Sequence, residues 1–327
     1  MKTLVTGGAG FIGSHLVDHL VEDGHDVAVL DDLSKGREEN LARHRGNPRV
    51  SFHRVNVADK EACQPHFEGV ERVFHIAGRA DIVPSIEDPS AYFESNVTGT
   101  VSILECAREA GVKRFVYAAS SSCYGIPDET PTPETAEIRT EYPYALTKHL
   151  GECCVLHWSR VYDLPAVSLR FFNVYGPRSR TTGAYGAVFG VFLAQKLGGH
   201  PFTVVGDGTQ ARDFVFVTDV AEACVLAAGS AQHGEVLNVG AGSPQSVNRL
   251  VELLDGEVVY LPKRPGEPDI THADISRIRE TLAWEPRVSF EEGVSVMMEN
   301  IELWREAPLW TPGSIAEATR EWFEKLG

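Results

Sequence analysis

The chain has 327 residues, of which 43% are hydrophobic and 23% are charged, a composition typical of a globular protein with a sizeable core. Its 30 Lys and Arg residues against 46 Asp and Glu residues give a net charge of −16, which repels nucleic acid and anionic membranes. No apolar run approaches the roughly 18 residues of a membrane span, and the first residues do not resemble a secretory signal. We therefore expect no nucleic-acid partner and no membrane partner.

The first half of the chain alternates between strand-like and helix-like segments. Strand-like runs cover 3–5, 26–30, 50–55, 72–76, 114–118 and 166–172, and helical periodicity covers 12–22, 96–110 and 143–160. Alternation at these lengths is typical of right-handed βαβ units, which build a parallel sheet. The pattern predicts an α/β fold with a Rossmann-type, doubly wound parallel sheet.

The pattern changes after residue 173, where glycine and proline become more frequent and the segments become shorter. The length predicts about two domains. We expect a first domain over 1–172, joined by part of 213–240, and a smaller mixed α/β domain over the rest of 173–327. Near the end, the sequence predicts helices over 290–304 and 315–325, the last with a capping box of Ser314 and Glu317.

The cysteines favour a reducing compartment. They are Cys63, Cys106, Cys123, Cys153, Cys154 and Cys224. No pair has the C-x-x-C spacing of a zinc ribbon or a thioredoxin-like motif, so we expect no metal site. We interpret them as reduced thiols in the core of a cytoplasmic protein.

Three glycines follow the first strand and open the first helix. Gly7, Gly10 and Gly13 have the spacing at which a strand turns tightly into a helix and lets the backbone approach a pyrophosphate. The N-terminus of the helix then offers free N–H groups and a positive dipole end to the phosphates. The loop therefore predicts a dinucleotide site.

An acidic residue stands where such a site needs one. Asp31 ends the second strand about twenty residues after the glycines, the place of a carboxylate that binds ribose. A 2′-phosphate would meet this carboxylate, so we expect NAD rather than NADP, although Lys35 weakens the preference. Asp32, Ser34 and Gly36 complete this expected part of the cofactor site.

A second set of residues points to proton transfer. Tyr144 and Lys148 lie four residues apart in a predicted helix and so share one face. An ammonium beside a phenol lowers the pKa of the phenol, which can then act as a general base. The serine run 120–122 follows the fifth strand, and Ser120 can position a substrate hydroxyl for Tyr144.

At this point the sequence resembles an extended short-chain dehydrogenase/reductase of the nucleotide-sugar epimerase/dehydratase branch. The matching strings are TGGAGFIGSHL (6–16), LDDLS (30–34), FHIAG (74–78), NVTGT (96–100), SSSCYG (120–125), YPYALTK (142–148), RFFNVYGP (170–177), GDGTQARDFVFVTDVA (206–221) and RPGEP (264–268). They cover nearly the whole chain in the order of the family. Their closest likeness is to 4-epimerases of UDP-hexoses and UDP-N-acetylhexosamines.

The resemblance implies a Rossmann domain that holds NAD, a smaller domain that holds a UDP-sugar, and a homodimer formed through helices near 91–110 and 143–162. It implies further NAD contacts at Phe11, Ile12, Asn56, Val57, Ala77, Gly78, Asn96, Tyr144, Lys148 and Phe171. Asn56 stands where the family often has Asp. It implies substrate contacts at Ser85, Ser122, Tyr144, Asn173, Val188, Thr203, Val205, Arg212, Arg264, Glu267 and Thr271. Arg212 and Arg264 suit a pyrophosphate, because a guanidinium fork matches phosphate oxygens.

The serine run also bears on the reaction that the resemblance implies. Dehydratases of the family have Thr-Asp-Glu at the place of 120–122, and uronate decarboxylases have Glu at 122, whereas this chain has no carboxylate at 121 or 122. We therefore expect 4-epimerisation through a 4-keto sugar. The alternatives are a 4,6-dehydratase or other lyase that uses Glu94 or Asp81, a UDP-uronate 4-epimerase, and an NAD-binding protein without catalysis.

One position predicts the size of the substrate. In the 4-epimerases that this sequence resembles, the sugar pocket is lined by the residue seven positions after the second phosphate-binding arginine. Counted from Arg264, that residue is Thr271. A threonine leaves room for an N-acetyl group that a tyrosine would exclude. We expect UDP-N-acetylglucosamine and UDP-N-acetylgalactosamine as substrates, with the plain UDP-hexoses left open. We expect the tail after Trp304 to pack on the body of the protein.

Overall fold

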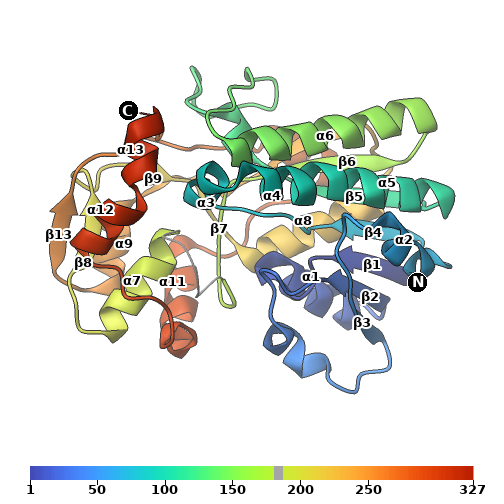
Figure 1. Ribbon diagram of the computed structural model, residues 1–327, viewed down its shortest axis with the longest axis horizontal. Helices are drawn as coiled ribbons and strands as arrows, with labels where there is room; N and C mark the ends of the chain where they lie inside the picture. The colour runs from blue at the N-terminus through green and yellow to red at the C-terminus, as the bar shows by residue number, and fades with distance from the viewer. Residues whose placement is uncertain (180–186, 327) are drawn as a thin grey trace.

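A parallel sheet of 7 strands forms the centre of the computed structural model, which describes residues 1–179 and 187–326 (Figure 1). In spatial order the strands are β11 (Glu235–Val239), β6 (Ala166–Phe171), β5 (Arg114–Ser120), β4 (Arg72–His75), β1 (Lys2–Thr6), β2 (Asp26–Asp31) and β3 (Val50–Arg54). The chain order reverses between β1 and β4, the point at which a doubly wound sheet binds its ligand. The predicted fold class is confirmed.

Helices cover both faces of this sheet because its strands are apolar on both faces. Adjacent residues of β1 point in opposite directions, so Val5 packs into one hydrophobic core and Leu4 into another. The core around Val5 includes side chains of α1 (Phe11–Glu22), α8 (Val217–Gly229) and α10 (Ser276–Leu282). The core around Leu4 includes α2 (Lys60–Cys63), α5 (Gly99–Glu109) and α6 (Pro143–Tyr162).

Short elements fill the connections. They are 3₁₀ turns at Glu38–His44, Gln64–Phe67 and Ser121–Tyr124, the helices α3 (Ile82–Glu87) and α4 (Pro89–Phe93), and a π-helical turn at Glu94–Thr98. The helix predicted over 96–110 therefore starts later as an α-helix, because the π turn joins α4 to α5. Figure 1 shows α4 and α5 running beside α6 along one side of the molecule.

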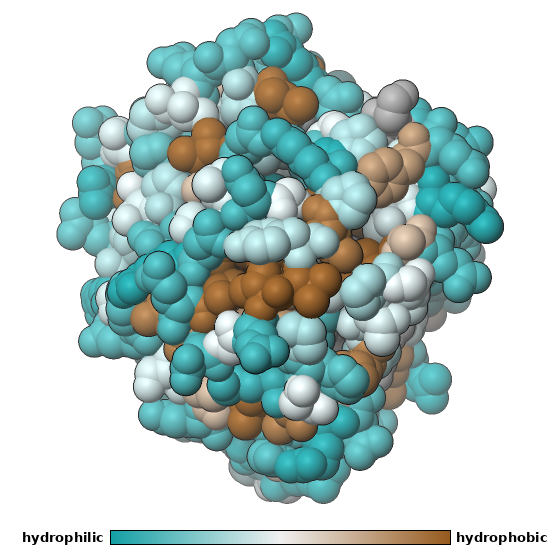
Figure 2. Space-filling view, turned by 90° about the vertical axis from the view of Figure 1, so that its left-hand side faces the viewer, coloured by the Kyte–Doolittle hydropathy of each residue, from teal (hydrophilic) through white to brown (hydrophobic). Residues whose placement is uncertain are grey.

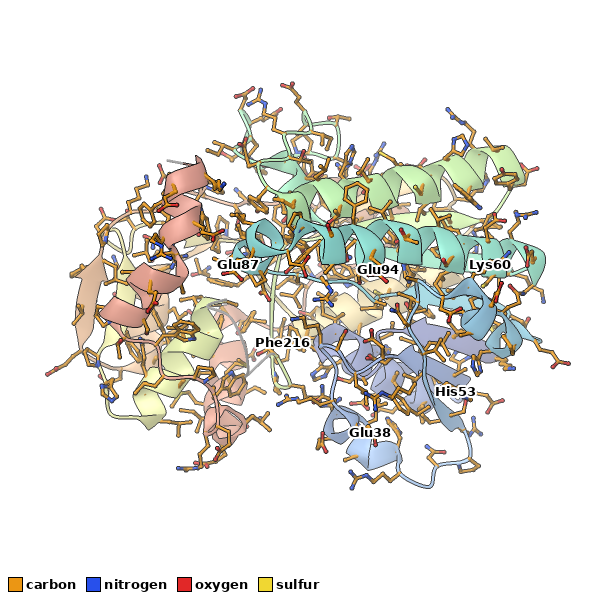
Figure 3. The ribbon with its side chains drawn as sticks, in the orientation of Figure 1. Glu38, His53, Lys60, Glu87, Glu94 and Phe216 are labelled. Carbon is orange, nitrogen blue, oxygen red and sulfur yellow. The ribbon has the colours of Figure 1, made fainter. Side chains whose placement is uncertain are left out.

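The second part of the chain, on the left of Figure 1, contains short strand pairs and helices around an aromatic core. The strands are β7 (Asn173–Tyr175) with β10 (Phe214–Phe216), β8 (Phe202–Val205) with β13 (Val258–Leu261), and β9 (Ala211–Arg212) with β12 (Gln245–Ser246). The helices are α7 (Val188–Leu197), α9 (Val247–Leu254), α11 (Phe290–Glu299), α12 (Pro312–Ala318) and α13 (Arg320–Leu326). Phe216, which lies between the two halves of the molecule in Figure 3, packs edge-on against Tyr175 in this core.

The C-terminal helices correct two predictions. The expected helix over 315–325 is two helices, because the chain leaves helical geometry at Thr319. The predicted capping box of Ser314 and Glu317 is wrong: Thr311 is the N-cap and Ser314 is its partner. Pro312 explains the earlier start, since its fixed φ suits the first helical position. The segment 290–304 likewise divides into α11 and a 3₁₀ turn at Ile301–Trp304.

Figure 2 views the molecule from the left-hand side of Figure 1, the side formed by the second part of the chain. This face shows hydrophobic surface surrounded by hydrophilic side chains.

All six cysteines are free thiols, and Cys63, Cys106, Cys123 and Cys224 are buried as expected. Cys153 is exposed and the neighbouring Cys154 is half-buried, so the prediction of core thiols is wrong for this pair on α6. Within 1–179 and 187–326, the helices are all too short or too polar to cross a bilayer.

Candidate active site

A cavity of about 740 Å³ opens at the carboxyl ends of the central strands, a size that suits a cofactor with a substrate. Gly7 follows β1, Ala77 follows β4, and Ser120 ends β5, and all three line the cavity. Every predicted cofactor residue except Asn96 lines it, and so does every predicted substrate residue except Ser85. The topology thus brings together residues from 7 to 271.

The glycine loop has the close packing that a dinucleotide cradle requires. A Cβ atom on Gly13 would lie 2.2 Å from the Gly7 carbonyl oxygen, and one on Gly7 would lie 2.7 Å from Ala77 Cα. Helix α1 begins directly after Gly10, which has no side chain to cap the first N–H groups. Residues 10–13 line the cavity at the positive end of the helix dipole, which favours phosphate groups, so the loop fits NAD.

Asp31 lines the same cavity beside the glycine loop. Its carboxylate accepts hydrogen bonds from the Ala9 N–H (3.0 Å) and the Leu33 N–H (2.9 Å), which fix its position at the end of β2. Burial raises the pKa of Asp31, and these hydrogen bonds oppose the rise. Each carboxylate oxygen has a second lone pair, so the group can also accept ribose hydroxyls.

The two predicted residues outside the lining are buried supports. Asn96 accepts a hydrogen bond from the Arg79 N–H (2.7 Å), and its amide donates to the Arg79 carbonyl (3.0 Å) and to Thr147 Oγ1 (3.0 Å). Ser85 is fully buried and donates to the Ile82 carbonyl (2.6 Å). Both therefore hold the loop and helix that follow β4.

The predicted catalytic residues meet in one hydrogen-bonded group. The Tyr144 hydroxyl donates to Ser120 Oγ over 3.1 Å, and the Ser122 hydroxyl donates to the same oxygen over 2.9 Å. Ser120 ends β5, Ser122 lies in the following 3₁₀ turn, and Tyr144 lies in the first turn of α6. The Ser122 N–H also donates to this oxygen (3.2 Å), so Ser120 Oγ is the acceptor in all three contacts and its own proton is available to a substrate oxygen.

Lys148 lies one helical turn beyond Tyr144 and is buried. Its Nζ donates to the Ala118 carbonyl over 2.7 Å, and burial lowers the pKa of Lys148 to about 8. We expected the ammonium to lower the pKa of Tyr144, but burial raises it, against the hydrogen bond to Ser120. The cost of burying the phenolate therefore determines the direction of the shift.

A buried ion pair, which the sequence analysis missed, supports the serine turn. The Arg170 guanidinium on β6 donates to both carboxylate oxygens of Glu152 on α6, at 2.6 Å and 3.0 Å, and to the Tyr124 hydroxyl at 2.8 Å. Tyr124 in turn donates to Asn238 Oδ1 (2.7 Å). The arrangement ties β6, α6 and β11 to the end of the turn that carries Ser122. The signal was an arginine inside an apolar strand.

The predicted phosphate-binding arginines lie together at the other side of the cavity. Glu267 forms ion pairs with Arg264 (3.1 Å) and Arg212 (3.5 Å), and Arg212 also donates to the Pro268 carbonyl (2.9 Å). All three side chains are mostly buried. A carboxylate between two guanidinium groups fixes both of them, and a guanidinium fork matches the geometry of phosphate oxygens.

Thr271 also lines the cavity, and its neighbours define its orientation. Its hydroxyl donates to Asn173 Oδ1 (2.8 Å) and accepts from the Asp213 N–H (3.0 Å). Because Asn173 Oδ1 is an acceptor here, the amide NH₂ of Asn173 is the group left for a ligand. The small side chain at 271 is thus part of the cavity wall next to Asn173.

The lining contains further residues that the sequence analysis did not place there. Asp81 and Glu94, the two carboxylates of the lyase alternative, both line the cavity. In Figure 3, Glu94 lies along the helical stretch formed by α4 and α5. Trp310 and Trp322 of the C-terminal tail also line it, and no motif in the sequence indicates such a role.

Comparisons with known proteins agree with this geometry. The profile of the NAD dependent epimerase/dehydratase family matches residues 3–240. A UDP-glucose 4-epimerase of Mycolicibacterium smegmatis is 39% identical over 307 residues, which are 91% of this chain and 98% of the relative.

Two solved structures have the same fold. A UDP-glucose 4-epimerase of Thermotoga maritima with UDP-glucose is 37% identical, has a TM-score of 0.85, and aligns over 94% of this chain and 99% of its own. A UDP-N-acetylglucosamine 4-epimerase of Methanobrevibacter ruminantium in complex with UDP-N-acetylmuramic acid is 31% identical, with a TM-score of 0.86 over 92% and 98% of the two chains. These findings confirm the predicted family, enzyme class and cofactor: the chain belongs to the NAD dependent epimerase/dehydratase family.

Proposed function

We propose that the protein is an NAD-dependent UDP-sugar 4-epimerase. The observation that supports this most is the hydrogen-bonded group of Tyr144, Ser120 and Ser122 in a cavity that fits NAD, at a turn with no carboxylate at 121 or 122. Tyr144 removes the proton of the sugar 4-hydroxyl, and Ser120 holds that hydroxyl. NAD, when bound, supplies a reversible acceptor for the C4 hydride.

The remaining residues bind and orient the substrate in this proposal. Arg212 and Arg264 hold the pyrophosphate, and the amide of Asn173 donates to the same part of the substrate. The 4-keto sugar must rotate in the cavity before the hydride returns to its other face. The sugar is therefore held less tightly than the nucleotide. The two arginines thus supply binding energy remote from the reacting carbon.

We propose UDP-N-acetylglucosamine and UDP-N-acetylgalactosamine as the preferred substrate pair. Thr271 lies in the cavity wall next to Asn173, and its side chain leaves space that a tyrosine would fill. An acetamido group at C2 is then accommodated while the keto sugar turns. The plain pair, UDP-glucose and UDP-galactose, is the comparison for this preference.

A lyase is the second candidate, because Asp81 and Glu94 line the cavity and the charge of Asp81 contributes to the raised pKa of Tyr144. In that reaction one of these carboxylates would do the acid–base work for loss of a substituent. A UDP-uronate 4-epimerase differs only in the group at C5. A binding protein without catalysis would have no use for the Tyr144–Ser120 contact.

The test is product analysis by nuclear magnetic resonance after incubation with UDP-hexoses, UDP-N-acetylhexosamines and UDP-uronates. We expect an equilibrium mixture of the two 4-epimers from each acetylated substrate, with no added NADH consumed. A 4-keto-6-deoxy sugar would establish the lyase, turnover of uronates alone would establish the uronate epimerase, and retained NAD without turnover would contradict an enzymatic role.

We also propose the homodimer and the two domain roles that the resemblance implies. Residues 1–172 with part of 213–240 would hold NAD, and the rest of 173–327 would hold the UDP-sugar; β11 of the returning segment lies next to β6 in the sheet. A homodimer through α4–α5 and α6 would cover exposed apolar side chains on these helices, among them Phe93, Leu146 and Tyr162. Light scattering of Leu146→Glu tests this. Free thiols support a cytoplasmic location.

A further inference from the structure

The tail after Trp304 reaches the phosphate end of the cavity. It first passes Trp310, whose carbonyl accepts a hydrogen bond from Gln195 Nε2 (2.8 Å), and Gln195 also donates to Thr203 Oγ1 (2.9 Å) on β8. Helix α12 then buries Ile315 in the aromatic core. These contacts fix the tail against the second part of the molecule and direct α13 toward α3 of the first part, on which it packs (Figure 1).

Helix α13 places one large side chain against the loop that carries Arg264. Trp322 is 3% exposed, and its indole N–H donates to the Pro265 carbonyl over 2.9 Å. The face of the same ring lies 5.4 Å from Arg264 Cζ, within the range of a cation–π contact. One side chain thus binds both the backbone of the loop and the guanidinium that the loop presents.

We propose that Trp322 is a positioning residue for Arg264 and that α13 is part of the nucleotide-binding site. An unsupported arginine has many rotamers, and ordering it on binding costs free energy. Here Glu267 forms an ion pair with the Arg264 guanidinium, whose Cζ lies 5.4 Å from the centroid of the Trp322 ring, so the guanidinium is oriented before the ligand arrives. The indole also gives Arg264 a partner that does not neutralise its charge.

The proposal rests on the proposed function, in which Arg264 binds the pyrophosphate of a UDP-sugar. It makes a narrow claim about binding energy: Trp322 acts on the phosphates through Arg264 and not on the uridine. A residue that merely stabilises the fold would affect UDP and uridine alike. The probes are therefore UDP and uridine, titrated into the full chain by calorimetry, with NAD content measured in each preparation.

For Trp322→Ala we expect the Kd of UDP to rise on the order of tenfold, because the Arg264 side chain must then be ordered when the ligand binds. The Kd of uridine and the NAD content should stay within about twofold, and KM for the sugar nucleotide should rise while kcat changes little. Trp322→Phe keeps an aromatic face and should recover most of the affinity. Phe323→Ala is the matched control, because Phe323 is the next residue on α13 and is 39% exposed.

A double-mutant cycle with Arg264→Ala tests whether the two residues act together. Once Arg264 is removed, Trp322→Ala should change the Kd of UDP by less than about twofold. An undiminished effect in that background, or equal losses for UDP and uridine, would overturn the proposal. If Trp322→Ala does not fold, the same cycle with Trp322→Leu, which keeps an apolar side chain but removes the aromatic face, measures the coupling instead. Failure of the unmodified protein to bind UDP would instead overturn the proposed function.

Discussion

Tyr144 donates a hydrogen bond to Ser120 across 3.1 Å, from the first turn of α6 to the end of β5. The two residues are 24 positions apart in the chain, and the packing of α6 on the sheet brings them together. Ser120 is thereby oriented by the same phenol that accepts the substrate proton in the proposed reaction. Loss of either hydroxyl would remove one member of a pair, so their effects on kcat should not be additive.

Tyr144→Phe should lower kcat by a factor on the order of a hundred or more, because it removes the general base and leaves the ring in place. NAD should remain bound at the level of the unmodified protein, measured by its absorbance after the protein is denatured. Tyr162→Phe is the control, since it removes a phenol from an exposed position of the same helix. Near-normal turnover of Tyr144→Phe would show that another group takes the proton.

Lys148→Met should move the acidic limb of the kcat profile to higher pH. The Lys148 ammonium favours the phenolate, and burial already raises the pKa of Tyr144, so removal of the positive charge raises that pKa further. The measurement is kcat from pH 5 to 10, below and above the pKa of about 8 that burial gives Lys148. An unchanged limb with a lower plateau would assign Lys148 to cofactor binding alone.

Thr271→Tyr should reduce kcat/KM for the acetylated UDP-sugars on the order of a hundredfold while the plain UDP-hexoses lose much less, because the ring occupies the space of the acetamido group. Thr271→Val separates volume from hydrogen bonding: it removes the hydroxyl that donates to Asn173 with little change in size. We expect this variant to affect both substrate pairs equally. Equal losses from Thr271→Tyr would mean that other residues limit the pocket.

Gly13→Ala should abolish retention of NAD, because the new Cβ would lie 2.2 Å from the Gly7 carbonyl oxygen and would force the loop open. Gly229→Ala is the matched substitution at a glycine with nothing within 4 Å of the added atom. Its NAD content, determined by chromatography, should equal that of the unmodified protein. Full NAD content in Gly13→Ala would place the pyrophosphate elsewhere.

The buried His75 should make stability depend on pH. Its Nδ1 lies 2.7 Å from Thr6 Oγ1 and its Nε2 lies 3.0 Å from Thr100 Oγ1, an arrangement that suits the neutral ring. Burial lowers the pKa of His75 to about 3 from 6.5, so its contribution is present above pH 6.5 and is lost as pH falls toward 3. Between pH 7 and pH 5 the free energy of unfolding should decrease by about 2 kcal/mol from this residue.

Urea denaturation at both pH values measures this effect, and His75→Gln supplies the reference. Glutamine can still bridge the two threonines but does not titrate, so the difference between pH 7 and pH 5 should shrink by that amount. An identical pH dependence in the two proteins would show that the pKa of His75 is the same in the folded and the unfolded state.

The amino-acid sequence determined the central sheet, because each strand is a short apolar run between turn signals and each long helix has regular periodicity. It also located the glycine loop, Asp31 and the Tyr144–Lys148 pair, since their chemistry depends on short spacings within one element. Prediction from local patterns was wrong near the end of the chain. Helix α12 begins earlier than predicted, at Pro312, and the helix predicted over 315–325 is interrupted at Thr319.

Only the tertiary structure decided what depends on contacts between distant segments. It placed Asp81 and Glu94, which the sequence analysis named only for the lyase alternative, in the cavity wall, and it buried Ser85 and Asn96 as supports. It also set the direction of the Tyr144 pKa, because the cost of burying a phenolate depends on everything packed around it. Trp322 joined Arg264 across 58 residues for the same reason: burial and distance arise from the fold, and no spacing in the sequence encodes them.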